Sequence, residues 1–222
     1  MNERLKTMTT NTHARTRIKV CGITTEESAH AAINAGADAI GFVLVENTPR
    51  YIEPETAAAI MFSLPPFISA VGVVQDLDVD QFCALEYSCP AHTMQLHGKE
   101  SVDTVCACGP GVIKAFKYED ATINSQLTRW AKVDELDAIL IDGSAGGTGE
   151  SFDWSKLAPH IVDYPKKIII AGGLNASNVA EVIKTLRPYA VDVSTGVEDA
   201  PGVKNPQKIA EFCAAVRAAD AS

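Results

Sequence analysis

The chain has 222 residues, of which 46% are hydrophobic and 21% are charged, and its formal net charge is −9. This composition excludes a disordered chain, a collagen-like chain and a small protein held together by disulfides. No apolar run approaches the roughly 18 residues that a membrane span needs, and no basic stripe typical of nucleic-acid-binding domains is visible. We therefore expect a soluble protein with neither a membrane nor a nucleic-acid partner.

The first residues and the cysteines indicate the compartment. Residues 1–16 are polar and lack the apolar segment of a secretory signal, so we expect a flexible leader before a single domain over residues 17–222. The six cysteines form no C-x-x-C pair and have no histidine at zinc-ligand spacing, which favours a reduced, cytoplasmic protein. Four histidines show no ligand spacing with carboxylates, so we expect no metal: His13, His30, His92 and His160.

Short β-branched segments alternate with alanine-rich helical patterns from residue 17 to the end. Eight strands are predicted, with starts 20 to 30 residues apart, which leaves room for a helix between consecutive strands. They start near Arg17, Asp38, Phe67, Ala91, Gly111, Asp137, Lys167 and Ala190. Most are apolar almost throughout, as parallel strands covered by helices are. Eight βα units favour a closed (β/α)₈ barrel, the TIM barrel, over an open doubly wound α/β sheet.

Several residues mark the boundaries of helices. Thr24-Thr25-Glu26-Glu27 has the pattern of a capping box, and Gly36 stands where the first helix should end. Pro54 suits the first position of the second helix, and Asn175 suits the cap of a helix through Asn178–Leu186.

Two glycine-containing loops are candidates for a phosphate site. In a (β/α)₈ barrel the active site lies at the C-terminal ends of the strands, and phosphate often binds between the loops after strands seven and eight. Gly172-Gly173 follows the seventh predicted strand and Ser194-Thr195-Gly196 follows the eighth. Glycine lets backbone N–H groups approach an anion closely. Each loop alone would be read as a tight turn, but the pair favours a bound phosphate.

Cys21 ends the first predicted strand. Side chains alternate along a strand, so Arg17, Lys19 and Cys21 share the face that points into the barrel. A buried lysine needs a partner, and we predict that Asp192 on the neighbouring eighth strand is the partner of Lys19. The lysine should then lower the pKa of Cys21 and favour its thiolate. A buried structural cysteine is the competing interpretation.

Asp142 ends the sixth predicted strand and precedes a glycine-rich loop. An aspartate before glycines is often a turn former, but strands one and six lie nearly opposite each other in a ring of eight. A cysteine base on one side and an aspartic acid on the other would flank a small sugar. Phe152-Asp153-Trp154 would anchor this loop as a lid.

Other strand-end residues carry weaker signals. Arg50, after the second strand, suits bidentate binding of a planar carboxylate, although a solvated surface arginine is the alternative. His97 lies near Gln95 at the end of the fourth strand, where a hydrogen-bonded structural histidine is the simpler interpretation. Four further acidic residues are expected to be solvated or to cap helices: Glu46, Asp76, Glu119 and Glu198.

An ordered set of motifs covers most of the chain, from about Arg17 to Ile209. The set includes Lys19-Val20-Cys21-Gly22-Ile23-Thr24, Gly41-Phe42-Val43, Pro49-Arg50, Gln95-Leu96-His97-Gly98, Ile113-Lys114-Ala115-Phe116, Gly146-Gly147-Thr148-Gly149, Ala171-Gly172-Gly173-Leu174 and Asp192-Val193-Ser194-Thr195-Gly196-Val197-Glu198. Each motif alone is modest. In this order they resemble the phosphoribosylanthranilate isomerase family of tryptophan biosynthesis.

This resemblance implies an aldose–ketose isomerase, an intramolecular oxidoreductase on a (β/α)₈ barrel. The reaction would be the Amadori rearrangement of N-(5-phosphoribosyl)anthranilate to 1-(2-carboxyphenylamino)-1-deoxyribulose 5-phosphate. Asp142 would protonate the ribose ring oxygen as general acid, and Cys21 would remove the C2′ proton as general base. The substrate would be bound by Arg50, His97, Gly172, Gly173, Thr195 and Gly196. No cofactor is implied, because the anilino nitrogen supplies the electron push, and the protein would be a monomer or a homodimer.

The sequence departs from the family pattern at five places: Leu44, Thr48, Val74-Gln75-Asp76, Thr195 and Asn205. These changes would alter the rim of the third loop and the fit of the substrate, but they remove neither the acid nor the base. Two alternatives stay open, another sugar-phosphate isomerase and a phosphosugar-binding barrel without activity. A metal-dependent epimerase would need His and Asp ligands at several strand ends, and an enzyme with two catalytic aspartates would need Asp at position 21. The presence of both Cys21 and Asp142 argues against a silent barrel.

Overall fold

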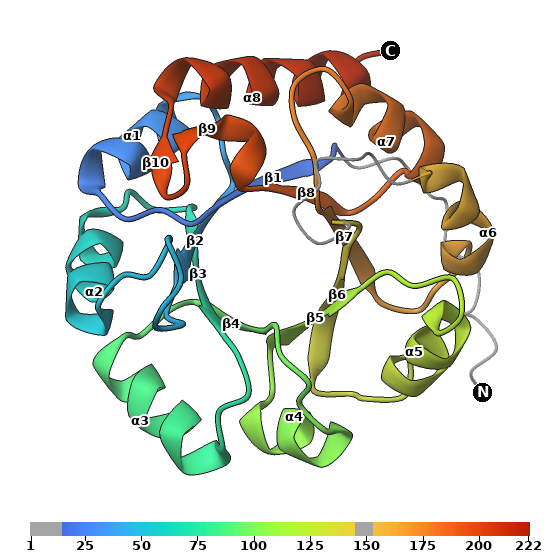
Figure 1. Ribbon diagram of the computed structural model, residues 1–222, viewed down its shortest axis with the longest axis horizontal. Helices are drawn as coiled ribbons and strands as arrows, with labels where there is room; N and C mark the ends of the chain where they lie inside the picture. Colours follow the sequence, from blue (N-terminus) through green and yellow to red (C-terminus); the bar gives the residue numbers. More distant parts are fainter. Residues whose placement is uncertain (1–14, 145–152) are drawn as a thin grey trace, which may run out of the picture.

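The computed structural model describes residues 15–144 and 153–222. Eight parallel strands close into a barrel in the order β1 to β8, and the helices surround it (Figure 1). The strands are β1 (Arg17–Cys21), β2 (Ala39–Val43), β3 (Ser69–Val74), β4 (Thr93–Leu96), β5 (Val112–Lys117), β6 (Leu136–Asp142), β7 (Lys167–Ala171) and β8 (Ala190–Val193). The predicted (β/α)₈ barrel is confirmed, and each strand begins within two residues of its predicted start.

The helices follow the strands in alternation. They are α1 (Glu26–Asn34), α2 (Pro54–Ser63), α3 (Val79–Ser88), α4 (Val102–Cys108), α5 (Ile123–Trp130), α6 (Ala158–Ile161), α7 (Val179–Leu186) and α8 (Pro206–Asp220). Short 3₁₀ helices η1 (Trp154–Lys156) and η2 (Thr195–Val197) precede α6 and follow β8, and β9 (Glu198–Ala200) with β10 (Val203–Lys204) forms an antiparallel hairpin. Within the described ranges no helix is both long enough and apolar enough to cross a membrane.

The first helix is capped one residue later than the sequence pattern predicts. Thr25 is the N-cap of α1, where its Oγ1 accepts a hydrogen bond from the Ser28 backbone N–H at 3.2 Å. The Ser28 hydroxyl donates to the Thr25 carbonyl oxygen at 2.8 Å and does not accept from the Thr25 N–H, so the predicted capping box does not form. Gly36 lies just beyond the helix at φ +92°, as predicted for its C-terminal end.

The prediction for the second helix is confirmed, whereas the prediction for the cap of α7 is wrong. Pro54 is the first residue of α2. Asn175 does not cap α7, because its side chain accepts hydrogen bonds from the N–H and the hydroxyl of Ser177 and closes a local turn. The helix therefore begins at Val179, with Asn178 at the N-cap position.

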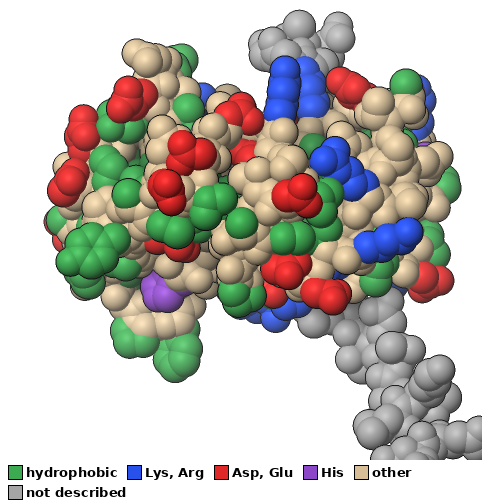
Figure 2. Space-filling view, turned by 90° about the horizontal axis from the view of Figure 1, so that it is seen from below, with side chains coloured by type: hydrophobic (Ala, Val, Ile, Leu, Met, Phe, Trp, Pro, Cys, Tyr) green, Lys and Arg blue, Asp and Glu red, His purple; other side chains and the backbone are tan. Residues whose placement is uncertain are grey.

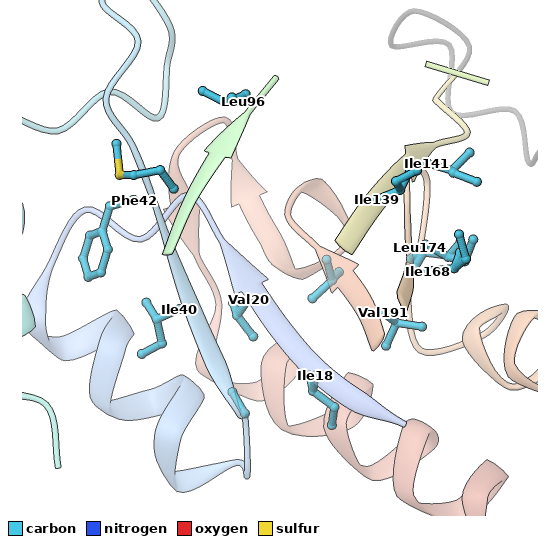
Figure 3. Packing of buried hydrophobic residues seen from close by; sticks show 14 of the residues in the cluster. Ile18, Val20, Ile40, Phe42, Leu96, Ile139, Ile141, Ile168, Leu174 and Val191 are labelled. Atoms are coloured by element: carbon cyan, nitrogen blue, oxygen red, sulfur yellow. The ribbon is translucent and has the colours of Figure 1, made fainter. Parts of the chain in front are cut away.

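The main hydrophobic core lies between the strands and the helices. Residues that alternate along β1 and β2 point outward into it, and Ile18, Val20, Ile40 and Phe42 are all fully buried there (Figure 3). Each such side chain contributes roughly 1.5–3 kcal/mol of transfer free energy. A smaller cluster, which includes Leu140, occupies the interior of the barrel.

The contacts with the barrel begin at Arg15, two residues before the predicted start of the domain. Thr16 is fully buried, and its N–H and hydroxyl donate hydrogen bonds to Asp220 at 2.8 and 2.7 Å. Arg15 forms an ion pair with Asp38 at the start of the next strand. These contacts connect the entry of β1 to the end of α8. Residues 1–14 lie outside the described ranges.

The negative charge is distributed over the outer surface. Figure 2 shows acidic side chains scattered among apolar and basic ones over one side of the barrel, rather than gathered in one patch. The net charge of −9 therefore describes the helical surface and does not define the potential at the mouth of the barrel.

Candidate active site

A cavity of about 310 Å³ opens at the C-terminal ends of the strands. Its lining includes seven of the eight residues predicted for the site: Cys21, Arg50, His97, Asp142, Gly172, Gly173 and Thr195. Gly196 does not line the cavity but packs directly behind it. Gln95 and Asp192 also line the cavity. The sequence placed Gln95 beside His97 at the end of the fourth strand and Asp192 beside Lys19, but it indicated no contact of either residue with the substrate.

Lys19 and Asp192 form the predicted ion pair inside the barrel. The two residues are neighbours in the register of β1 and β8, and Lys19 Nζ lies 2.8 Å from Asp192 Oδ2. Their side chains are 4% and 7% exposed. The predicted pairing is confirmed, because strand alternation turns both side chains to the interior and barrel closure makes the two strands adjacent.

The expected activation of Cys21 by Lys19 is wrong for the isolated site. Burial raises the pKa of the Cys21 thiol, and the nearby Lys19 ammonium compensates only in part. The Asp192 carboxylate, which is hydrogen-bonded to Lys19, also raises the pKa of Cys21. Cys21 is therefore a thiol at neutral pH in the site as it stands.

Gly41 on β2 provides the space for the Cys21 and Lys19 side chains. A Cβ atom at this position would lie 2.7 Å from Cys21 Sγ and 3.1 Å from Lys19 Cε. Only a residue without a side chain fits beside both groups. Gly41 thus belongs to the architecture of the site, although it carries no chemistry of its own.

Asp142 lies across the cavity at the end of β6. Its Oδ1 accepts a hydrogen bond from the Ser144 N–H at 2.8 Å, and its Oδ2 lies 3.6 Å from His97 Nε2. Burial alone would raise the pKa of Asp142, but the contacts with His97 and Ser144 outweigh it and hold this pKa below its ordinary value. Asp142 is thus ionised in the resting site.

Gln95 orients His97. The Gln95 Nε2 and His97 Nδ1 atoms are 3.0 Å apart. With the Gln95 amide donating, His97 Nδ1 is the acceptor and its Nε2 carries the proton that faces Asp142. His97 is therefore a hydrogen-bonded neighbour of the acidic group as well as a wall of the cavity.

The two glycine loops leave backbone donors available. Gly172 and Gly173 have φ values of +91° and +66°, which turn their loop sharply. No acceptor is found, over the part of the chain that the structure describes, for the N–H groups of Gly173, Thr195 and Gly196. A Cβ at Gly196 would lie 1.9 Å from the Leu174 carbonyl oxygen, so the two loops touch. This arrangement suits an anion with several acceptor oxygens.

Gly172 has a second role beside Asp142. A Cβ at this position would lie 2.3 Å from Asp142 Oδ1 and 2.3 Å from the Ser144 nitrogen. The absence of a side chain thus leaves room for the hydrogen bond that lowers the Asp142 pKa. The sequence pattern explained this glycine by phosphate binding alone.

Arg50 is held by an acidic residue that was expected to be solvated. Glu198 accepts hydrogen bonds from Arg50 Nε at 2.8 Å and from Nη2 at 2.6 Å. It also accepts a hydrogen bond from Lys204 Nζ at 2.6 Å, and its side chain is only 5% exposed. The prediction for Glu198 is wrong, because the hairpin of β9 and β10 turns this carboxylate towards the loop after β2. The expectation of exposed side chains is confirmed for Glu46, Asp76 and Glu119.

The predicted lid falls largely outside the described ranges, which omit residues 145–152. Trp154, predicted to anchor it, is buried at the start of η1. The six cysteines are all free. Within residues 15–144 and 153–222, no three His, Cys, Asp or Glu side chains form a group able to hold a metal ion.

Comparison with known proteins agrees with this geometry. The family model described as N-(5′phosphoribosyl)anthranilate (PRA) isomerase matches residues 18–215. The chain belongs to the phosphoribosylanthranilate isomerase family. Members of this family are isomerases of tryptophan biosynthesis, of the intramolecular oxidoreductase type that interconverts aldoses and ketoses.

Individual phosphoribosylanthranilate isomerases match nearly end to end. The enzyme from Geotalea uraniireducens (strain Rf4) is 44% identical over 197 residues, which cover 89% of this chain and 96% of the relative. The crystal structure of the Thermus thermophilus isomerase has a TM-score of 0.81 at 38% identity, covering 91% of this chain and 98% of that one. Another isomerase structure, with a TM-score of 0.80 and 34% identity, covers 91% and 99% and is a complex with reduced 1-(o-carboxyphenylamino)-1-deoxyribulose 5-phosphate.

Proposed function

We propose that the chain converts N-(5-phosphoribosyl)anthranilate to 1-(2-carboxyphenylamino)-1-deoxyribulose 5-phosphate with Asp142 as general acid and Cys21 as general base. The observation that carries this proposal is the cavity that these two side chains share, from opposite sides, with the free N–H groups of Gly173 and Thr195. Family membership supports the reaction, and the cavity supports the assignment of roles.

The proposed reaction proceeds in two proton-transfer stages. Asp142 donates a proton to the ring oxygen, the C1′–O bond breaks, and the anilino nitrogen becomes a protonated Schiff base. The Cys21 thiolate then removes the C2′ proton, and the resulting enolamine gains a proton at C1′ and loses one from oxygen to give the ketone. Both groups thus act in the protonation state that the resting site disfavours. A small fraction of the enzyme, with both groups in their reactive forms, carries the flux.

The substrate is proposed to lie across the barrel mouth. Its phosphate accepts hydrogen bonds from the N–H groups of Gly173, Thr195 and Gly196. Its aromatic carboxylate binds the side of Arg50 that Glu198 leaves free, since Nη1 has no partner among the described residues. His97 and Gly172 complete the wall beside Asp142. The related complex with the reduced product supports a site of this chemical class.

The remaining aspects of the proposal concern the protein as a whole. It acts without a cofactor, because protons and electrons all stay within the substrate and the two catalytic side chains. We place it in the cytoplasm, where thiols such as Cys21 stay reduced. It is a monomer or a homodimer, and a mass measurement in solution decides between them.

A fluorescence assay tests the proposal. Phosphoribosylanthranilate is generated in situ and its fluorescence should decay when the purified protein is added. Asp142→Asn and Cys21→Ala should each lower kcat by roughly 10²–10⁴-fold and leave KM within a few-fold of its original value. Wild-type turnover in either variant would refute the role assigned to that residue. Binding of the reduced product without any turnover would instead favour a phosphosugar-binding barrel.

A further inference from the structure

One oxygen of Asp192 is buried in the cavity without a partner. Its Oδ2 accepts the hydrogen bond from Lys19, but Oδ1 has no hydrogen-bond partner among the residues that the structure describes. The whole residue is 7% exposed. Most buried polar atoms in proteins are hydrogen-bonded, and one without a partner destabilises the folded state. Such an atom in the wall of a cavity points to a ligand that completes its bonding.

The position of Asp192 defines what the ligand must supply. Asp192 lines the same cavity as Cys21 and Asp142. It pairs in register with Lys19, two residues before Cys21, so its carboxylate lies beside the cysteine on the adjoining strand. An ionised carboxylate only accepts hydrogen bonds, so the ligand must donate one. The Lys19 ammonium holds the carboxylate from its other oxygen, which fixes the direction in which Oδ1 points.

We propose that Asp192 Oδ1 accepts a hydrogen bond from the C2′ hydroxyl of the sugar and thereby turns the C2′ hydrogen towards Cys21. The proposal rests on the proposed function, in which Cys21 must reach that hydrogen. The phosphate end of the substrate is assigned to the loops at Gly173 and Thr195, and the aromatic carboxylate to Arg50. The C2′ hydroxyl is bonded to the carbon from which Cys21 removes the proton. It is therefore the hydroxyl that lies nearest to Asp192, which stands beside Cys21.

The electrostatics of the pair fit this role. Burial raises the pKa of Asp192, and the Lys19 ammonium offsets this shift only in part. A hydroxyl donated to Oδ1 would supply the second hydrogen bond that favours the ionised form. Asp192 therefore has two functions on two oxygens: one binds Lys19 and the other orients the substrate.

The experiment compares three unreactive analogues of the reduced product. One carries all hydroxyls, one lacks the hydroxyl at C2, and one lacks the hydroxyl at C3. In the wild-type protein the loss of the C2 hydroxyl should weaken binding, measured by calorimetry, by about 10- to 100-fold, as expected for a hydrogen bond to a charged group. We use the ratio of the dissociation constant of the analogue without the C2 hydroxyl to that of the full analogue. This ratio reports the contact itself and is insensitive to a general loss of stability.

Two variants connect this ratio to Asp192. In the double variant Lys19→Met/Asp192→Leu the buried ion pair becomes an apolar pair of similar size, which proteins often tolerate without loss of stability. The ratio should fall to about 1 in this variant, and to an intermediate value in Asp192→Asn, whose amide oxygen is a weaker, neutral acceptor. Thermal unfolding of each variant tests whether it is folded.

The matched control is a second buried lysine–carboxylate pair, formed by Lys114 and Glu100. Lys114 Nζ lies 2.7 Å from Glu100 Oε2, their side chains are 2% and 1% exposed, and neither lines the cavity that contains Cys21. Glu100→Gln should therefore keep the wild-type ratio. A purely structural role for Asp192 would weaken both analogues equally and leave the ratio unchanged in its variants.

Each outcome has a separate meaning. If the wild-type protein turns over the natural substrate but the ratio is unchanged in Lys19→Met/Asp192→Leu, the role of Asp192 is overturned and the proposed function stays intact. The same conclusion follows if removal of the C3 hydroxyl, and not of the C2 hydroxyl, causes the loss of affinity that depends on Asp192. Absence of both turnover and analogue binding in the wild-type protein would overturn the proposed function, and the inference with it.

Discussion

Glu198 binds one edge of the Arg50 guanidinium, at 2.8 Å to Nε and 2.6 Å to Nη2, and leaves Nη1 as the donor without a described partner. Arg50 is thus a fixed donor and not a solvated side chain. The same carboxylate accepts a hydrogen bond from Lys204, and Gly202 lets the hairpin approach the loop that carries Arg50, since a Cβ there would lie 2.2 Å from the Pro49 oxygen. One buried acid therefore joins the loop after β2 to the hairpin after β8.

Replacing Glu198 by glutamine should weaken substrate binding more than it slows the chemistry. The neutral amide can no longer hold Arg50 by two charge-assisted hydrogen bonds, so the guanidinium loses its fixed direction. We expect KM to rise by about 10-fold, with kcat changed by less than about 3-fold, because the contact is made equally in the bound substrate and the transition state. Steady-state fluorescence kinetics measure both constants.

The neighbouring Asp199 provides the control. It is half exposed and pairs with Lys208 at 2.8 Å on the outside of the hairpin. Asp199→Asn should leave KM unchanged, since exposed ion pairs contribute little. An equal rise of KM in both variants would mean that the hairpin responds as a whole and that Glu198 has no specific effect on Arg50.

Glu198 should also make the stability of the protein sensitive to acid. Burial alone would raise the pKa of this carboxyl, but Arg50 and Lys204 outweigh it and hold the pKa below its ordinary value of 4.5. A group with a lowered native pKa stabilises the fold above its unfolded pKa, and this contribution is lost as the pH falls through the native pKa. Glu198→Gln should be less stable than wild type by roughly 3 kcal/mol at neutral pH, and the gap should narrow below about pH 4.5.

Denaturant unfolding at several pH values measures this gap. Because the other acidic groups are present in both proteins, their titration cancels in the difference. A gap that stays constant down to the acid limit would show that Glu198 titrates with the same pKa in the folded and unfolded chains.

The fold and the pair of Lys19 and Asp192 could be predicted because they follow from periodicity. Alternation places both side chains inside the barrel, and the count of eight strands makes β1 and β8 neighbours. The contact of Glu198 with Arg50 joins residues 148 positions apart through a hairpin whose direction no local pattern specifies. The ion pair of Glu198 with both cations was therefore invisible in the sequence.

The pKa of Cys21 shows a different limit of sequence reasoning. The sequence correctly indicated a lysine beside the cysteine, but the sign of the shift depends on a balance between burial and two opposite charges. Lys19 also contacts Asp192, so its effect on Cys21 is smaller than that of an isolated cation. Similarly, the sequence pattern indicated Thr24 as the helix cap, whereas the Thr25 side chain accepts the capping hydrogen bond from the Ser28 N–H.

The rate should be nearly independent of pH just above neutrality. The reactive state needs protonated Asp142 and ionised Cys21, while their pKa values are shifted down and up respectively. Between two such values, a rise in pH reduces the protonated fraction of Asp142 as fast as it increases the thiolate fraction of Cys21. We expect kcat/KM to vary by less than about 2-fold between about pH 7 and pH 8.5, where the substrate phosphate is already a dianion.

A change of one unit in the logarithm of kcat/KM per pH unit over this range, in either direction, would contradict the paired mechanism. A rising line would mean that deprotonation of Cys21 alone limits the rate. A falling line would mean that protonation of Asp142 alone does. His97→Asn, which removes the imidazole that helps to lower the Asp142 pKa, should raise the level of the plateau without introducing a slope.

Gly41→Ala should impair catalysis without a large effect on the fold. The added Cβ would lie 2.7 Å from Cys21 Sγ, closer than atoms in proteins pack, so the thiol must move. A displacement of about 1 Å in a reacting group costs on the order of 100-fold in rate, and we expect kcat to fall by about 10- to 100-fold.

Gly72→Ala is the matched control, because its Cβ would meet the flexible Met94 side chain at 2.6 Å on the next barrel strand, away from the cavity. Both variants should lose about 1–3 kcal/mol of stability from overpacking, but only Gly41→Ala should lose activity. Equal kcat values in the two variants would show that Cys21 tolerates the crowding and that its position is less critical than the proposed proton transfer requires.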